Sequence, residues 1–412
     1  MSAAPREPTD SRRPLLSDAA AAFALTLLMA MQPLTTDLYL PTLPQIAADL
    51  AAPPAQVQLT MSVMVLAWGI GQLLIGPQAD RWGRRPVLSA GLTTYLLASL
   101  GAALSQDIVW LIAMRVAQGI GVAAAVVCAR AMVRDLFEPV RGAHVMSLAM
   151  TGLGLVALCG PPLGGALATV LGWRGVFAVL AVLMAVYLVF FWRRVPETIA
   201  ARNPQALKLA PLLASWQRIV RQPVFLAFTA LSATTYAGVF VFLSGSSFVY
   251  IGVLHTPVWV YGLILGQVAG CYVAGTALCR FWLARHGVAG TVRRAGWLTL
   301  TGGLSMMLFA ALGLPGIWPL LLPQCLYSMG HGIHQPCGQT FAIGPFPREA
   351  GTAAALAGFL QASCGFAAGL LIGHTLDGTT RPLAFCQGLI ALLVTAVAWG
   401  LVQRSAVRTF QR

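Results

Sequence analysis

Charged side chains are scarce in this chain of 412 residues, since only 9% of them are Asp, Glu, Lys or Arg. A soluble globular domain carries roughly 25% charged residues, so this composition excludes a soluble globular domain. Hydrophobic residues make up 58% of the chain, and the mean hydropathy is +0.77. These values indicate a protein that crosses a membrane several times.

Paired cysteines and catalytic motifs are also missing. The eight cysteines stand singly, and no Cys-x-x-Cys or Cys/His pattern occurs. We therefore expect neither a metal site nor a disulfide framework, and we expect the cysteines to pack as small apolar residues. The sequence has no nucleotide-binding loop and no Ser/His/Asp or His-Glu-x-x-His arrangement. We therefore expect neither an enzyme nor a cofactor.

Twelve apolar runs are long enough, at about 20 residues, to cross a bilayer as helices. The runs are continuously apolar, whereas the strands of a membrane β-barrel alternate, so helices are favoured. The first run continues into Asp37 without a small-residue cleavage site, which indicates a retained helix and not a signal peptide. The predicted spans are residues 19–41, 56–76, 86–104, 108–130, 143–168, 173–193, 223–249, 257–281, 291–313, 316–338, 349–372 and 382–404.

Basic residues mark one side of the membrane. With the amino terminus inside, every Lys and Arg except Arg115, Arg174 and Arg381 falls in cytoplasmic loops, tails or helix ends. Positively charged short loops stay in the cytoplasm, so both termini are predicted to be cytoplasmic. The net charge of +14 is then explained by topology and by contact with anionic lipid headgroups, and we expect no nucleic-acid partner.

The spans form two groups of six, separated by the longest polar stretch. This stretch is predicted to be a cytoplasmic linker that contains a surface helix near residues 212–219. The predicted division is an amino-terminal tail (1–18), a six-helix bundle (19–193), the linker (194–222), a second six-helix bundle (223–404) and a carboxy-terminal tail (405–412).

A dense charge cluster separates the second and third runs, with the pattern G-x-x-x-D-R-x-G-R-R from Gly76 to Arg85. Because such charge cannot sit in lipid, we expect a short cytoplasmic hairpin. The spacing resembles the loop between helices 2 and 3 of the major facilitator superfamily, a group of secondary transporters. Residues 279–287 echo it in the second half without the acidic residue. The resemblance implies an all-α membrane protein with 12 transmembrane helices in two six-helix bundles.

Four further segments sharpen this resemblance. Residues 36–44 are similar to a signature of the Bcr/CflA branch of drug:proton antiporters, which includes chloramphenicol and florfenicol exporters. Residues 115–121 are similar to a motif shared by antiporters of the family. Residues 160–165, preceded by Gly152, resemble a motif of the exporters, and residues 348–356 resemble the start of helix 11. The combination indicates an exporter of this branch.

Two ionisable residues lie clearly within the predicted spans, Asp37 in the first and Arg115 in the fourth. A charge near the bilayer centre costs several kcal/mol. Each residue is about seven positions from the periplasmic end of its helix, which places both at a depth of roughly 11 Å. Helices 1 and 4 line the central cavity in the family, so we predict that this pair couples transport to protons. The alternative is a structural ion pair inside the first bundle.

Aromatic walls with few polar groups suit a drug-sized amphipathic ligand. Core packing remains the alternative for each aromatic residue, and a hydrogen-bonded packing role remains the alternative for His331 and His334. The predicted substrate cavity comprises Asp37, Tyr39, Arg115, Gln118, Tyr236, Phe240, His331 and Gln335.

Two other groups of residues have roles that the resemblance implies. Gly76, Asp80, Arg84 and Asp135 would form a cytoplasmic latch that stabilises the outward-open state, and a solvated turn is the alternative. The export motif comprises Gly152, Gly160, Pro161, Gly164 and Gly165. Its glycine spacing allows close helix packing, and we expect Gly164 to lie on a seam between helices 5 and 8 that slides during transport.

These features predict a proton-coupled exporter, or antiporter, of small amphipathic drugs such as phenicol-type or related antibiotics, working by alternating access. We expect a functional monomer in the bacterial inner membrane, with the drug, protons and lipid as its partners. Asp37 would take up a proton when facing outward and release it inward. The alternatives are an exporter of a nucleoside, sugar or amino acid, and a membrane sensor that transports nothing.

Overall fold

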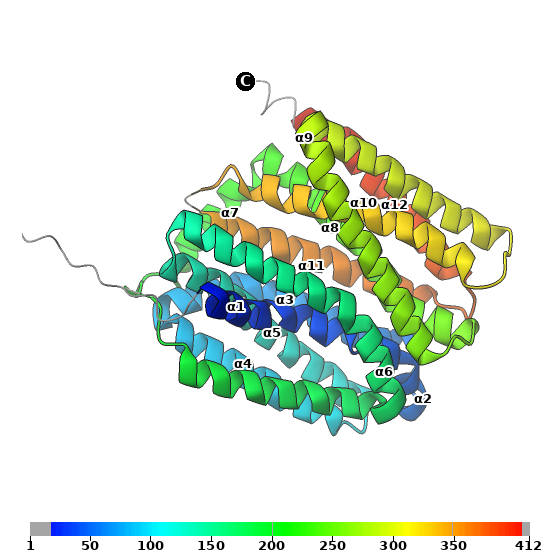
Figure 1. The fold of residues 1–412 in the computed structure, drawn as a ribbon, viewed down its shortest axis with the longest axis horizontal. Helices are drawn as coiled ribbons and strands as arrows, with labels where there is room; N and C mark the ends of the chain where they lie inside the picture. The colour runs from blue at the N-terminus through cyan, green and yellow to red at the C-terminus, as the bar shows by residue number, and fades with distance from the viewer. Residues whose placement is uncertain (1–17, 200, 348, 406–412) are drawn as a thin grey trace, which may run out of the picture.

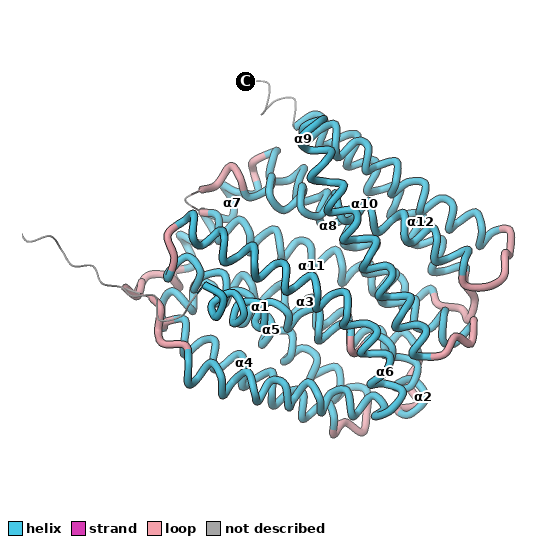
Figure 2. The backbone as a smooth tube through the Cα atoms, viewed as in Figure 1, coloured by secondary structure: helices cyan, strands magenta, loops and turns pink. Residues whose placement is uncertain are grey.

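The computed structural model describes residues 18–199, 201–347 and 349–405, which form helices joined by short loops and contain no strand (Figures 1 and 2). The predicted tails, 1–18 and 405–412, lie almost wholly outside these residues, as does Arg348 of the segment 348–356. The predicted all-α fold class is confirmed for the described part of the chain.

The α-helices follow the predicted spans closely. They are α1 (Asp18–Asp37), α2 (Leu43–Asp49), α3 (Pro54–Trp82), α4 (Arg84–Ala103), α5 (Ile108–Leu136), α6 (Pro139–Arg194), α7 (Leu209–Val220), α8 (Pro223–Ser247), α9 (Val258–Ala311), α10 (Trp318–Ile343), α11 (Ala350–Thr375) and α12 (Arg381–Ala396). A 3-10 turn at Leu40–Thr42 follows α1, and π-helical turns at Phe248–Val253 and Val397–Leu401 extend α8 and α12.

Two helices, α6 with 56 residues and α9 with 54, are far longer than the roughly 20 residues that span a bilayer. Each contains one glycine with non-helical dihedral angles, Gly172 at φ 65° and ψ 179° and Gly287 at φ 60° and ψ −175°. A side chain would be strained at these angles, so glycine lets the chain reverse there. Each long helix is therefore two helices joined at a glycine. Pro161 and Pro162 leave the helical dihedral angles of α6 intact.

Eight helices of the described residues are long and apolar enough to cross a membrane, namely α3, α4, α5, α6 from His144 onward, α8 with its π-turn, α9, α11 and α12 with its π-turn. Every predicted span coincides with a helix or with half of α6 or α9. Because α1 and α10 lie outside this group of eight, the count of twelve spans stays a prediction.

The charged segment 76–86 is less of a loop than we predicted. Helix α3 continues through Trp82, and a single residue, Gly83 at φ 107° and ψ 157°, turns the chain into α4. The ion pair between Asp80 and Arg84 bridges this turn at 2.5 Å. Gly287 makes the corresponding turn in the second half, which explains why the echo at 279–287 keeps a glycine there although it lacks the acidic residue.

The largest contacts between the halves are those of α3 with α11 and of α6 with α9, and both pairs run side by side in Figure 1. Helix α7 confirms the surface helix predicted near residues 212–219. It lies beside the start of α11, where Ser215 and Arg218 both donate hydrogen bonds to Glu349, at 2.8 and 2.6 Å. The predicted domain boundaries themselves stay a prediction.

Candidate functional site

Asp37 is the last residue of α1, and its side chain is half-buried where the two halves meet. The Thr36 hydroxyl donates a hydrogen bond to the carboxylate over 3.2 Å. On the side of α6, a β-carbon at Gly160 would lie 3.2 Å from Asp37 Oδ2, so the glycine makes room for the carboxylate. The 3-10 turn that follows Asp37 contacts α8 and α9 of the second half. Asp37 is therefore positioned to respond to both halves.

Gly164 holds the chain that follows Asp37 against α6. A β-carbon at Gly164 would lie 2.7 Å from both the carbonyl oxygen of Asp37 and the α-carbon of Leu38, which are backbone atoms that cannot rotate away. Gly152 packs on Thr26 of the same helix α1. The nearest atoms to such a β-carbon thus belong to the chain at the end of α1, and the place of Gly164 on a sliding seam with α9 stays a prediction.

The seam between α6 and α9 is formed by neighbouring residues of the export motif. A β-carbon at Gly165 would meet the carbonyl oxygen of Val258 at 2.9 Å and the α-carbon of Gly262 at 3.2 Å. A β-carbon at Gly262 would in turn meet the carbonyl oxygen of Pro161 at 2.7 Å. Glycine on both helices thus brings the two backbones together, as packing in lipid favours. The export motif consequently contacts α1 on one face and α9 on the other.

Arg115 is fully buried inside the first half and forms no ion pair with Asp37, as far as the described residues show. Its guanidinium donates to Gln118 Oε1 at 2.8 Å and lies 4.2 Å from the centre of the Tyr39 ring. Gln118 passes the interaction on by donating to the hydroxyl of Ser99 at 2.8 Å. These contacts form one buried polar cluster of Arg115, Gln118 and Tyr39. The sequence predicted that all three residues line the substrate cavity.

The candidate residues of the second half also contact neighbouring side chains. Tyr236 is half-buried, packs against Phe240 and lies over Gly365 of α11. His331 shares a hydrogen bond of 3.1 Å with the hydroxyl of Thr235, and Gln335 donates to Gln361 at 3.0 Å.

His334 has the contacts of a packing residue. It is fully buried between helices, with one ring nitrogen 3.5 Å from the hydroxyl of Thr299 and the other 3.3 Å from the carbonyl of Val292. In the described part of the chain, no group of three or more His, Cys, Asp or Glu side chains is placed to hold a metal ion.

The structure brings Asp80, Arg84 and Asp135 of the predicted latch together. Arg84, which is only 3% exposed, pairs with Asp80 at 2.5 Å and with Asp135 at 2.9 Å. Asp80 keeps a side-chain exposure of 43%. Gly76 has open space in the direction of a β-carbon, with no atom within 4 Å. All four residues belong to the first half.

Glu197 joins the latch, although no sequence motif indicated it. Its carboxylate accepts hydrogen bonds from the backbone N–H groups of Arg84 at 2.9 Å and Arg85 at 3.2 Å. A carboxylate at a helix start satisfies free N–H groups and complements the helix dipole. Glu197 therefore fastens the start of α4 to the chain after α6. Glu197 and Arg84 are 113 residues apart in the chain, so no local sequence pattern could have predicted this contact.

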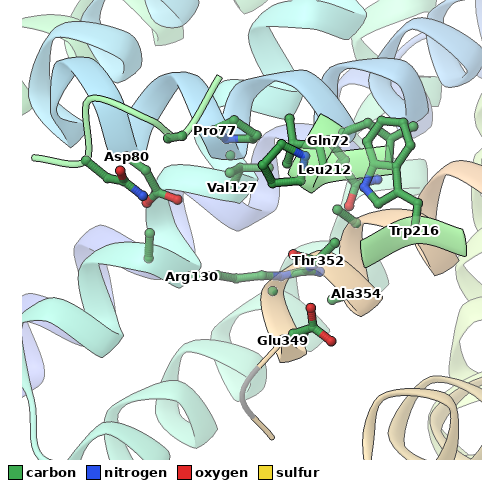
Figure 3. Close-up of a pocket in the computed structure, with 18 of the residues that line it drawn as sticks. Gln72, Pro77, Asp80, Val127, Arg130, Leu212, Trp216, Glu349, Thr352 and Ala354 are labelled. Carbon is green, nitrogen blue, oxygen red and sulfur yellow. The ribbon is translucent and has the colours of Figure 1, made fainter. Parts of the chain in front are cut away.

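A cavity of about 440 Å³ opens beside the latch, between the two halves and the linker (Figure 3). Its walls come from α3, α5, the linker with α7, and the start of α11. Gly76, Asp80 and Arg84 line it, whereas none of the eight residues predicted for the substrate cavity does. The seam at Gly165 lies close to the reversal of α6 at Gly172, and no residue of α6 lines this cavity.

Comparison with known proteins decides the family. Residues 25–370 match the family model described as "Major Facilitator Superfamily". The chain belongs to the Major Facilitator Superfamily. It is accordingly a multi-pass membrane transporter and not an enzyme, as the sequence predicted.

Curated relatives match nearly the whole chain. The chain is 30% identical to multidrug resistance protein D of Escherichia coli, over 90% of this chain and 93% of that protein. It is 28% identical to a bicyclomycin resistance protein homolog of Haemophilus influenzae, over 93% and 96%. It is also 28% identical to a chloramphenicol resistance protein of Pseudomonas aeruginosa, over 80% and 78%. The resemblance to the Bcr/CflA branch is thereby confirmed.

Solved structures show the same fold at low sequence identity. A D-xylose-proton symporter aligns with a TM-score of 0.74 at 15% identity, covering 93% of this chain and 98% of its own. An inward-facing, unoccupied bacterial homologue of the lysosomal transporter Spinster aligns with a TM-score of 0.69 at 15% identity, covering 97% and 95%. At this identity the likeness concerns the fold alone.

Proposed function

We propose that this transporter exports small amphipathic drugs, such as phenicol-type or related antibiotics, in exchange for protons and by alternating access. It would act as a monomer in the bacterial inner membrane, with both termini in the cytoplasm. The observation that carries the proposal is the position of Asp37, a half-buried carboxylate set against Gly160 of the export motif, where the turn after α1 contacts α8 and α9 of the opposite half.

Proton exchange follows from the cost of a charge at this depth. Holding an ionised carboxylate inside a span costs several kcal/mol, and binding a proton removes that cost. Arg115 is occupied by Gln118 and Tyr39 in this conformation and does not neutralise Asp37. A rearrangement of the halves that hydrates Asp37 in one state and buries it in the other would therefore load and release a proton. Substrate that occupies the same space would compete with protonation.

The two ends of the interface support alternating access. Backbone contacts through Gly165 and Gly262 close the end near Val258, while the cavity beside Asp80 separates the halves at the other end. We assign the open end to the cytoplasm, because the basic hairpin around Arg84 lies there. In this assignment the conformation is inward-facing, and drug from the cytoplasm reaches the interface through the cavity.

The latch would act in the opposite state. Asp80 is 43% exposed at the edge of the cavity, whose other wall includes the start of α11. Closing the cavity would bring the hairpin toward the free N–H groups at that start, where the helix dipole favours an anion. Gly76, with its open space, would allow the close approach of the two helices. The cluster of Asp80, Arg84 and Asp135 would then stabilise the outward-open state.

The proposal is tested in inverted membrane vesicles whose lumen has been acidified. Each compound of a panel of phenicols and other amphipathic drugs is added outside, and a pH-sensitive dye reports the lumen. We expect a transported drug to discharge the proton gradient only in vesicles that contain the protein. Binding of a drug to the purified protein without any proton movement would contradict antiport.

A further inference from the structure

Arg130 lies inside a membrane-spanning helix, and its guanidinium has no polar partner among the described residues. It lies on α5, which continues to Leu136, although the sequence pattern ended this span at residue 130. No described residue forms a hydrogen bond or an ion pair with its side chain. The side chain is exposed and lines the cavity beside the latch. Figure 3 shows it extended toward the start of α11, where Thr352 and Glu349 lie.

The charges around this cavity favour an anion. Arg130, Arg134 and Lys208 line it, and none of the three has a carboxylate partner among the described residues. The carboxylates that line it, Asp80 and Glu349, already pair with Arg84 at 2.5 Å and Arg218 at 2.6 Å. The excess charge that faces the cavity is therefore positive.

The remaining walls offer a donor and an apolar surface. Gln72 is 2% exposed, and its amide nitrogen has no acceptor although the residue lines the cavity. Val127, Leu212 and Trp216 supply apolar lining. A volume of about 440 Å³ falls within the range of small-molecule sites. An anionic group and an apolar body can therefore be accommodated together.

We propose that this cavity binds the oxyanion, a carboxylate or a phosphate, of an amphipathic molecule, with Arg130 as its main ligand. The planar guanidinium fork matches both oxyanions with two parallel hydrogen bonds. Gln72 donates from α3, and the apolar part of the molecule lies against Trp216. A soluble organic anion and an anionic lipid headgroup share this chemistry. The site is separate from Asp37 and does not depend on proton coupling.

The test uses the full chain in nanodiscs of phosphatidylcholine, and titration calorimetry with 2-naphthoate and its uncharged analogue 2-naphthamide. We expect 2-naphthoate to bind and the amide to bind about tenfold more weakly or not at all, because hydrogen bonds to a charged group are lost. Arg130→Gln should weaken 2-naphthoate by about tenfold, and Arg130→Lys should restore part of the affinity. Arg221→Gln removes an equal charge at an exposed position outside the cavity and should change the affinity less than about twofold.

Competition with phosphatidylglycerol, detected by native mass spectrometry, distinguishes an anionic lipid headgroup from a soluble organic anion. If 2-naphthoate displaces it from the wild type but not from Arg130→Gln, the oxyanion is a lipid phosphate. If the lipid does not compete, the ligand is a soluble organic anion. Unchanged 2-naphthoate affinity in Arg130→Gln would overturn the proposal, provided that thermal unfolding shows the variant folded. Inorganic phosphate binding as tightly as 2-naphthoate would overturn the role of the apolar wall.

Discussion

Gly164 allows a sharp test of how the export motif holds α1. In Gly164→Ala the new β-carbon would lie 2.7 Å from two backbone atoms of residues 37 and 38, whereas ordinary contacts begin at 3.4 Å. Helix α1 and helix α6 must therefore move apart by about 0.7 Å, which loosens packing around Asp37. Overpacking of this kind costs roughly 1–3 kcal/mol. We expect the free energy of unfolding to fall by about 2 kcal/mol.

The matched control is Gly154→Ala on the same helix. A β-carbon at Gly154 meets no atom within 4 Å, and Ala is favoured over Gly in a helix by roughly 0.5–1 kcal/mol. Both variants are unfolded by titration with a denaturing detergent, and drug-driven proton movement is measured in vesicles. Only Gly164→Ala should lose stability and transport. Equal behaviour of the two variants would refute the close contact between α1 and α6.

Three further predictions concern the seam, the helix cap and the buried arginine. Gly165→Ala inserts a β-carbon 2.9 Å from the backbone of α9, so drug-driven proton movement should fall severalfold because the halves cannot close on each other; unchanged transport would place the moving seam elsewhere. Glu197→Gln should lower the free energy of unfolding by about 1 kcal/mol through the loss of a charged helix cap, whereas Glu138→Gln, at a helix start without a side-chain cap, should not. Arg115→Ala should strongly impair transport and folding because it leaves the buried side-chain oxygen of Gln118 without its donor, and Arg115→Lys should recover only part, since an ammonium lacks the planar fork. Full transport by the Ala variant would mean that Arg115 only packs.

The elements that the sequence predicts well are those set by local physics. Continuous apolar runs predicted the helices, and the reversals at Gly83 and Gly287 follow from angles that only glycine adopts easily. The amphipathic stretch at α7 was likewise visible. The density of charge in segment 76–86 predicted a loop, but Asp80 and Arg84 instead stabilise the helix end and the turn around Gly83.

The contacts that the sequence could not predict join residues far apart in the chain. The depth of Asp37 and Arg115 was inferred from helix length, yet depth does not fix the direction of a side chain, and Arg115 points into its own half. The glycine spacing predicted close packing at Gly164. It did not predict which segment Gly164 packs against, because spacing along one helix carries no information about the neighbouring helix. The sequence did not indicate Arg130, because the apolar run that predicted its span ends at residue 130 whereas α5 continues to Leu136. Hydropathy alone cannot distinguish a residue at a helix end from one that lines a cavity.

The central claim is that Asp37 is the obligatory protonation site. Drug-induced proton release from purified protein, together with drug resistance in cells, tests it in wild type, Asp37→Asn and Asp37→Glu. The Asn variant keeps the shape and removes the titrating group, so proton release and resistance should both disappear while drug still binds. The Glu variant should retain part of both. If Asp37→Asn still releases protons and still confers resistance, Asp37 does not couple export to protons and the account is contradicted.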